Sequence, residues 1–170
     1  MNSLVGRTAH GTMWGMSTLR RVSGKVSVEN SQFGLWEDDP FDEGGGSWMA
    51  LEIADHPSFA TVDEGRVKVR SLHKDHYASV TLEYGQEAVA TAHGWEMIGA
   101  YRYVTRGAAV ELWSLFSGPA GVELELGEPQ SALWLQIFRR RPEGALPFEE
   151  SPLGAPEDLE EYWFYFSPCQ

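Results

Sequence analysis

The chain has 170 residues, of which 13 are Lys or Arg and 25 are Asp or Glu, so its formal net charge is −12. Apolar residues make up 42% of it, and a chain of this length buries roughly two-thirds of its unfolded surface, enough for one globular domain. Because phosphate binding requires clustered Lys and Arg, the charge argues against nucleic acid and an anionic membrane as direct partners.

Cys169 is the only cysteine, so no disulfide can form within the chain and no set of thiolates can hold a metal. This cysteine usage is typical of a reducing compartment. Residues 1–24 lack the run of about 7–15 apolar residues of a secretory signal, and no run approaches the roughly 18 of a membrane span. We therefore expect a cytoplasmic protein in which residues 1–24 are an N-terminal arm or a disordered leader.

Apolar and polar residues alternate in nine segments that we predict to be strands. The first contains Val26, Val28, Phe33 and Leu35, with a slip between the two pairs that we interpret as a bulge. The others are residues 49–53, 66–70, 79–84, 95–104, 110–116, 122–126, 133–138 and 162–166. Such alternation indicates that one face of each strand is buried and the other is solvated, as in antiparallel sheets.

The spacing of these segments, with almost no helical period between them, predicts an all-β fold. We expect residues 25–170 to form a single-domain antiparallel β-sandwich of about eight or nine strands. The best place for a helix is a short one near residues 157–161, because Pro156 suits a first helical turn.

The net charge comes from two segments, residues 37–43 and 143–161. They hold 12 of the 25 acids and no Lys or Arg, so the remaining 13 acids balance the 13 bases. Both segments also contain Pro and Gly residues that favour loops. The sequence therefore predicts long acidic loops on an otherwise neutral domain.

The tightest cluster of titratable side chains is His73-Lys74-Asp75-His76. Two imidazoles and a carboxylate could begin a metal site or an acid–base pair. Residues three apart point to opposite faces of a strand, however, and the cluster falls between two predicted strands, so we interpret it as a solvated turn. The chain has no nucleophile elbow, phosphate loop or dinucleotide fingerprint. We expect no catalytic residue, no cofactor and no metal.

Arg139-Arg140-Arg141 is the only basic run, and it closes an apolar segment. We interpret it as a gatekeeper that blocks aggregation of residues 133–138 and pairs with the acidic loop that follows. A dedicated anion site is the alternative.

Aromatic residues flank the acids in both acidic segments. Charges of one sign steer the encounter with a partner of the opposite sign, while aromatic rings supply the buried contact. The alternative is that the charges only solvate the surface. The first interpretation predicts a surface for a basic protein partner made of Trp36, Glu37, Asp38, Asp39, Asp42, Glu43, Trp48, Glu149, Glu150, Glu157, Asp158, Glu160 and Glu161.

Residues 26–36, Val-Ser-Val-Glu-Asn-Ser-Gln-Phe-Gly-Leu-Trp, resemble the opening strand of the competence protein J family, small bacterial β-rich proteins that inhibit a partner nuclease. The chain is also similar to uncharacterised actinobacterial proteins in Trp95-Glu96, in residues 133–140 and in the closing residues 161–168. The resemblance covers about residues 25–168 and implies a β-rich inhibitor. It brings no functional motif, and the loop at 143–160 is longer than in the family.

Three hypotheses follow. The first is a non-catalytic inhibitor or immunity protein that masks a basic partner. This partner is a nuclease or a toxin of another kind. The second is a β-sandwich that binds a small molecule or carbohydrate in a concave groove lined with Trp113, Trp134 or Trp163. The third is a metal-dependent enzyme that uses His73, His76, His93 and scattered acids.

Overall fold

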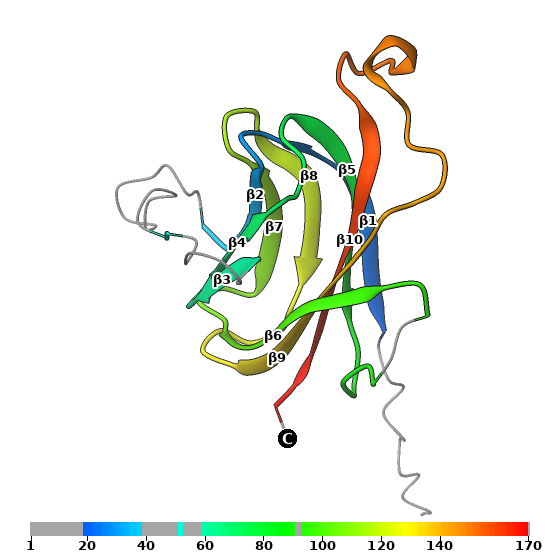
Figure 1. Cartoon of the computed structure of the whole chain (residues 1–170). Helices are drawn as coiled ribbons and strands as arrows, with labels where there is room; N and C mark the ends of the chain where they lie inside the picture. The colour runs from blue at the N-terminus through cyan, green and yellow to red at the C-terminus, as the bar shows by residue number, and fades with distance from the viewer. Residues whose placement is uncertain (1–18, 39–50, 53–58, 91–92, 170) are drawn as a thin grey trace, which may run out of the picture.

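The computed structural model describes residues 19–38, 51–52, 59–90 and 93–169. They form ten strands and one turn of 3-10 helix, with the strands in two layers packed face to face (Figure 1). The elements are β1 (Arg20–Val28), β2 (Gln32–Trp36), β3 (Ala60–Asp63), β4 (Arg66–Arg70), β5 (His76–Tyr84), β6 (Glu96–Val104), β7 (Ala109–Ser114), β8 (Gly118–Glu125), β9 (Ala132–Arg140), η2 (Phe148–Glu150) and β10 (Glu157–Pro168).

Each layer is a five-stranded sheet. The β10 sheet has the order β1-β5-β10-β9-β6, and the β2 sheet has the order β3-β4-β2-β7-β8. The all-β sandwich predicted from the alternation is confirmed. The expectation of wholly antiparallel sheets is wrong at one place, because β10 runs parallel to β5, with Tyr162 opposite Val80 and Phe166 opposite Tyr84.

The core lies between the two sheets and is built from the residues that alternate inward. Phe33 of β2 joins the two layers: its ring lies edge-on to Tyr162, with the centroids 4.8 Å apart, and to Phe164, at 6.2 Å. All three side chains are fully buried. Aromatic pairs in this geometry contribute about 0.5–1.5 kcal/mol beyond the area they bury.

The slip between Val28 and Phe33 is a tight turn, not a bulge. Asn30 and Ser31 have φ values of 52° and 61°, and Glu29 and Gln32 exchange backbone hydrogen bonds of 3.1 and 2.9 Å. Positive φ at both central residues is the geometry of a two-residue hairpin turn. The turn passes the chain from the β10 sheet to the β2 sheet, which no local pattern could reveal.

The helix expected near residues 157–161 is also absent, because this segment is the start of β10. Its backbone pairs with β5, where Glu157 lies opposite Tyr77, and with Leu146 through an isolated bridge. The register shifts between Glu157 and Glu161, and Asp158 has a φ of 56°. The pairing with β5 therefore overrides the local helical signal.

Two other boundaries differ from expectation. Residues 20–24, placed in an arm, are the first part of β1 and pair with residues 80–84 of β5; residues 1–18 lie outside the described part. Within the expected strand at residues 49–53, Leu51 and Glu52 are described and are not in a strand, while the rest lies outside the described residues. The sequence pattern missed β3, which is only four residues long.

The two sheets meet along both sides of the sandwich. β1 contacts β8, where Arg20 Nη1 donates a hydrogen bond to the carbonyl of Glu125 (2.8 Å). β6 contacts β3, where the Tyr101 hydroxyl donates to the carbonyl of Ala60 (3.3 Å). Within the described residues, no helix has the length and the apolar composition that a membrane span requires.

The connection from β5 to β6 crosses the outer face of the β10 sheet. Val89 of this connection and Gln136 of β9 exchange two hydrogen bonds, each of 2.7 Å. Gln136 is buried as a result, although it points away from the core. This crossing covers part of a sheet face that the alternation alone predicts to be solvated.

We expect Leu135→Ala to lower the free energy of unfolding by about 2–5 kcal/mol, because it removes a fully buried side chain and leaves a cavity between the sheets. The matched control is Leu72→Ala, since Leu72 is exposed, and its effect should stay within about 0.5 kcal/mol. Urea unfolding of both variants measures the difference. Equal losses would contradict the assigned core.

Candidate functional site

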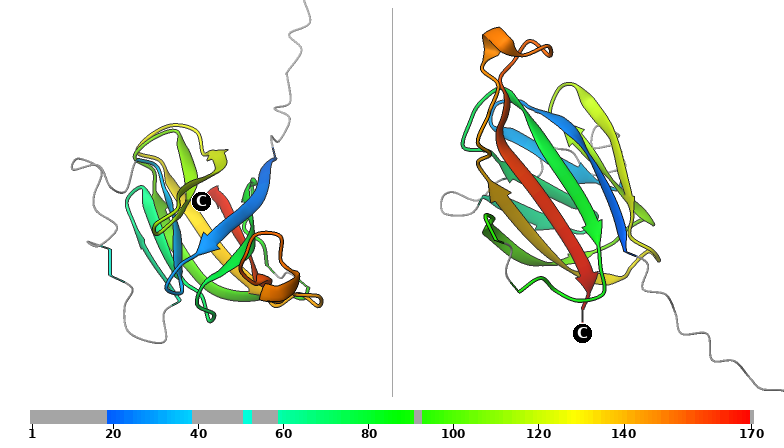
Figure 2. Two further views of the ribbon diagram at one scale, coloured as in Figure 1. Left: turned by 90° about the horizontal axis from the view of Figure 1, so that it is seen from above. Right: turned by 90° about the vertical axis from the view of Figure 1, so that its right-hand side faces the viewer.

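The segment between β9 and β10 projects beyond the end of the sandwich (Figure 1 and Figure 2). We call residues 143–154 the tip. Phe148 is 59% exposed and Leu153 is 46% exposed, and three exposed glutamates lie on the same short segment: Glu143, Glu149 and Glu150. Within the described part of the chain these glutamates form no ion pair. The tip thus combines exposed apolar side chains with unneutralised negative charge.

Local hydrogen bonds give the tip a defined conformation. The backbone N–H of Glu150 donates to Pro147 (3.1 Å), and that of Leu153 donates to the Ser151 hydroxyl (3.1 Å). At the base, Leu146 and Glu157 exchange backbone hydrogen bonds of 3.0 and 2.8 Å. The tip is therefore a turn tied to the first residue of β10.

Glu157 fastens the tip to the sandwich through its side chain. Its carboxylate is buried and accepts hydrogen bonds from the Ser151 hydroxyl (2.8 Å) and from Lys25 Nζ of β1. Lys25 also donates to Asp158 (3.1 Å). Glu157 and Asp158 were predicted to contact a partner, but both are engaged inside the molecule, and Glu157 is inaccessible.

Hydrogen bonds shift the pKa values of Glu157, Asp158 and Lys25. Lys25 and then Ser151 lower the pKa of Glu157. Burial raises the pKa of Asp158, but hydrogen bonds from Ser79 and Lys25 outweigh it, so the net shift is downward. Burial likewise opposes the charge of Lys25, and its hydrogen bonds to the two carboxylates leave its pKa raised. All three groups are charged at neutral pH.

Glu160 is wholly buried at the end of the core, so its assignment to a partner surface is wrong. Its Oε2 accepts hydrogen bonds from the Ser71 hydroxyl and from the backbone N–H of Leu72 (3.1 Å). Arg139 Nη1 lies 3.6 Å from Oε1, and His76 Nε2 lies 3.8 Å from Oε2. These side chains form a buried polar cluster.

His76 also departs from its predicted place in a solvated turn, because it is the first residue of β5 and is buried. Burial lowers its pKa against the opposing charge of Glu160, so the imidazole is neutral at neutral pH. The signal that could have located it is the alternation itself: His76 continues the buried row of Ala78, Val80 and Leu82. Glu160 continues the row of Tyr162 and Phe164 in the same way.

The buried polar cluster does not have the geometry of a catalytic triad. The Ser71 hydroxyl lies 3.0 Å from His76 Nε2, but Glu160 approaches this same nitrogen, and Nδ1 has no hydrogen-bond partner in the described structure. In a triad the carboxylate binds the other ring nitrogen and orients the imidazole toward the serine. The cluster therefore lacks the arrangement by which a triad activates its serine.

Trp36 lies on the outer face of the β2 sheet and is 1% exposed, so it is not a surface anchor. It packs in a cluster with Leu51, Trp113 and Leu115. A Cβ atom at Gly34 would lie 2.4 Å from the Trp36 ring, which shows that the ring lies over this glycine. The Trp36 side chain is therefore packed over Gly34, although the acidic residues next to it in the sequence had suggested that it was exposed.

Glu37 binds the connection between β6 and β7. It accepts hydrogen bonds from the Tyr103 hydroxyl (2.5 Å) and from the backbone N–H groups of Arg106 (2.6 Å) and Gly107. Asp38 is exposed and lies 3.7 Å from Arg106. The other predicted contacts of this segment, Asp39, Asp42, Glu43 and Trp48, lie outside the described residues.

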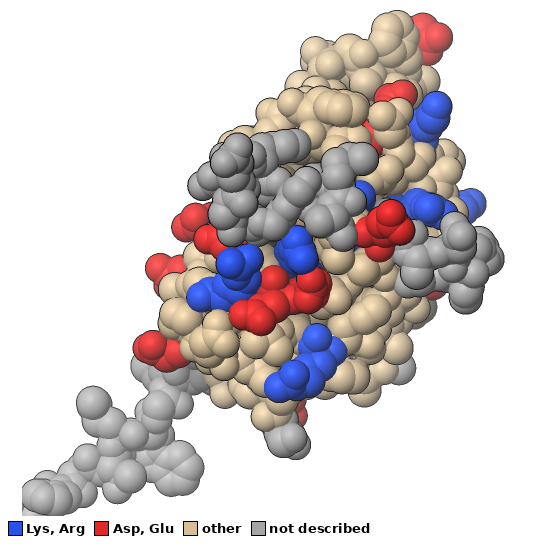
Figure 3. Space-filling view, turned by 90° about the vertical axis from the view of Figure 1, so that its left-hand side faces the viewer, with Lys and Arg blue, Asp and Glu red and all other residues tan. Residues whose placement is uncertain are grey.

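Acidic and basic side chains lie side by side on the face next to β3 and β4 (Figure 3). An example is the ion pair between Asp63 and Arg66 (2.6 Å).

Two of the three arginines in the basic run, Arg139 and Arg140, pair with acids of the segment that follows, as expected. Arg139 is buried and binds Glu96 (2.7 Å) as well as Glu160. Arg140 pairs with Glu161 and lies over the Trp95 ring, 4.5 Å from its centroid. Glu161 is therefore half-buried and paired within the sheet, and a role in partner binding would require it to leave Arg140.

The three tryptophans proposed to line a groove lie in different surroundings. Trp113 is buried in the cluster with Trp36. Trp163 stacks on Phe138, with centroids 5.0 Å apart, and meets Trp95 at 5.9 Å. Trp134 lines a pocket on the outer face of the β10 sheet. Among the described residues, no group of three or more His, Cys, Asp or Glu side chains could hold a metal ion.

No protein-family model and no curated protein matches the chain. Two solved structures do. One is ComJ from Bacillus subtilis, inhibitor of the DNA degrading activity of NucA, which is 12% identical and has a TM-score of 0.48. The match covers 91% of this chain and 100% of ComJ. The other, crocagin biosynthetic gene J, is 11% identical, with a TM-score of 0.47 and coverage of 99% and 90%. The structure comparison thus finds a weak resemblance to ComJ, as the sequence does.

We expect Lys25→Met to lower the melting temperature by several degrees at pH 7, because Glu157 loses its main cation. Carboxyls with a lowered pKa stabilise the fold above their unfolded pKa values of about 4 and lose this effect as the pH falls through the folded values. The gap between wild type and variant should therefore narrow as the pH falls below about 4. Lys74→Met, at an exposed lysine, is the control. Thermal unfolding from pH 7 to pH 3 measures both, and a gap that does not narrow as the pH falls over this range would contradict the assignment.

We expect Glu160→Ala to lower the free energy of unfolding by about 3–5 kcal/mol, because it leaves Arg139 buried without this partner. Glu161→Ala removes the neighbouring carboxylate from a pair with half-exposed Arg140 and should cost about 0–1 kcal/mol. Urea unfolding distinguishes the two. Similar losses would show that the buried polar cluster does not stabilise the fold.

Proposed function

We propose that the protein is a non-catalytic inhibitor or immunity protein, and that it binds a basic toxin or nuclease through the tip. The observation that carries the proposal is the exposure of Phe148 and Leu153 beside the three glutamates of the tip. A surface of this kind can enter a cationic cleft, because the apolar side chains fill the contact while the carboxylates replace the anionic ligand of the cleft.

The conformation of the tip supports this role. Because Glu157 and the bridge to Leu146 hold its base, binding costs less conformational entropy than ordering a free loop would. The net charge of −12 adds long-range attraction for a basic partner. Asp38, together with Asp39, Asp42, Glu43 and Trp48, is the proposed second contact, and a reducing cytoplasm is the proposed compartment.

The test uses three forms of the full chain as baits in lysate of the source organism at low and high salt. Phe148→Ala/Glu149→Lys/Glu150→Lys alters the tip, and Glu123→Lys/Glu125→Lys introduces the same charge change on β8 of the other sheet. We expect the wild type and the β8 control to retain the same basic protein and to inhibit it in a one-to-one complex. The tip variant should lose at least about 100-fold in affinity, as hot-spot truncation does.

Association of the wild type should slow as the salt concentration rises, because exposed charges are screened within about 8–10 Å at physiological ionic strength. Stopped-flow mixing with the captured protein measures this rate. If the tip variant binds as well as the wild type, or if the captured protein is acidic, the proposal is wrong.

A further inference from the structure

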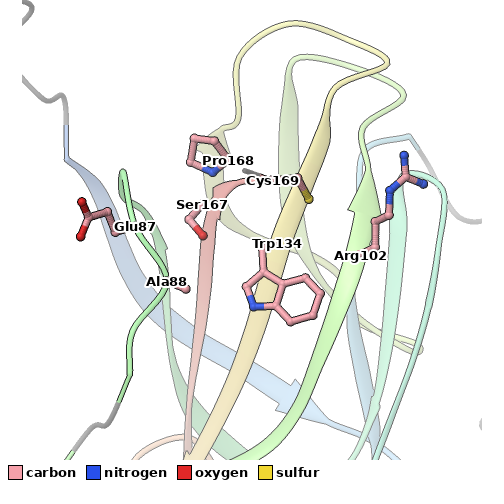
Figure 4. Close-up of a pocket in the computed structure, with 7 residues that line it drawn as sticks. All are labelled: Glu87, Ala88, Arg102, Trp134, Ser167, Pro168 and Cys169. Atoms are coloured by element: carbon pink, nitrogen blue, oxygen red, sulfur yellow. The ribbon is translucent and has the colours of Figure 1, made fainter.

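A pocket of about 590 Å³ lies on the outer face of the β10 sheet, beside the connection from β5 to β6. It is located where the end of β10 pairs with the start of β9. This volume lies within the range of about 300–1,000 Å³ that is typical of small-molecule sites. The pocket is lined by Glu87, Ala88, Arg102, Trp134, Ser167, Pro168 and Cys169 (Figure 4). It lies at the end of β10 opposite the tip (Figure 2).

Three of the lining residues stand in one row across the sheet. Arg102 of β6 lies opposite Trp134 of β9, and Trp134 lies opposite Ser167 of β10. Residues that face each other on neighbouring strands point to the same side. The Trp134 ring, which is 38% exposed, occupies the middle of the row and offers a flat apolar face. A planar ring is the shape that stacks on such a surface.

The Ser167 hydroxyl is an independent sign that the pocket takes a polar group. Ser167 is 1% exposed, and its Oγ has no hydrogen-bond partner in the described structure. More than about 90% of buried polar groups in proteins have a partner, and an unpaired one costs about 1–3 kcal/mol. A polar substituent of a bound molecule would satisfy it.

The charges on the two walls define the ligand further. Arg102 is exposed and makes no ion pair with the described residues. Glu87 lies on the other side of Trp134 (Figure 4). A guanidinium binds a carboxylate through two parallel hydrogen bonds, whereas Glu87 would repel a second negative charge. The ligand should therefore carry one acid group, at the Arg102 end.

We infer that this pocket binds a small aromatic carboxylate, with its ring against Trp134 and its carboxylate on Arg102. The site is separate from the tip, so either can exist without the other.

Isothermal titration calorimetry with the full chain tests the inference. The probes are indole-3-acetate and 4-hydroxybenzoate, with indole, which lacks the acid, and tryptamine, which carries a cation, as comparators. At least one acid should bind with a Kd of about 1 mM or below, and indole should bind about tenfold more weakly, the loss expected for a charge-assisted contact.

The variants assign the contacts. Arg102→Gln should weaken binding of the acid about tenfold, and Arg102→Glu should reverse the preference toward tryptamine. Trp134→Ala should abolish binding, while Trp134→Phe, which keeps a ring, should bind with intermediate affinity. Arg141→Gln and Phe116→Ala, which remove an exposed guanidinium and an exposed ring elsewhere, should leave binding unchanged.

The inference is overturned if neither acid binds at about 10 mM, or if Arg102→Gln and Arg141→Gln reduce binding equally. Because the titration contains no protein partner, its failure says nothing against the tip. Loss of partner capture with a functioning pocket would overturn the proposed function alone.

Discussion

The pairing of β10 with β5 on one side and β9 on the other is the constraint on which the rest of the structure depends. β10 is the longest strand, and it occupies the centre of its sheet. Its inward side chains, Tyr162, Phe164 and Phe166, meet the opposite sheet. Its first residue anchors the tip, and its penultimate residue, Ser167, lines the pocket. One strand thus fixes the core and the positions of two candidate sites.

The buried polar cluster gives this pairing its register. A slip by one residue would turn the apolar side chains of β10 outward, which burial alone forbids. A slip by two would keep the apolar faces but would move Glu160 away from Arg139 and His76, leaving the Glu160 carboxylate buried without these partners. The cluster therefore discriminates against the one misalignment that hydrophobicity tolerates.

Local alternation was sufficient to predict most strands and the sandwich, because the period of two is set by which face is buried. It failed where the outcome depends on distant chain segments. The acids after Pro156 suit a helix start locally, yet the backbone of Glu157 pairs with Tyr77, 80 positions away in the chain. Asn30 and Ser31 contain nothing that distinguishes a bulge from a change of sheet.

The predicted partner surface failed for a related reason. Trp36 and Glu160 were grouped with exposed acids because they are close to them in the sequence. Each lies on a covered face of its strand, however, and is buried. Two exposed residues of the prediction, Glu149 and Glu150, lie in the 3-10 turn η2, outside both sheets, where no sheet face competes. Of the residues that line the pocket, sequence reasoning named Trp134 alone as a binding residue, because the pocket exists only where β6, β9 and β10 lie beside the connection from β5.

The meeting of the sheets along both sides has a consequence for how this protein can be approached. β1 faces β8 and β6 faces β3, so the outermost backbone of each sheet is opposed by the other sheet. A partner that recruits strands by adding to an open edge would find these rims shielded. The two binding sites proposed above, the tip and the pocket, would accordingly use side chains instead of peptide groups.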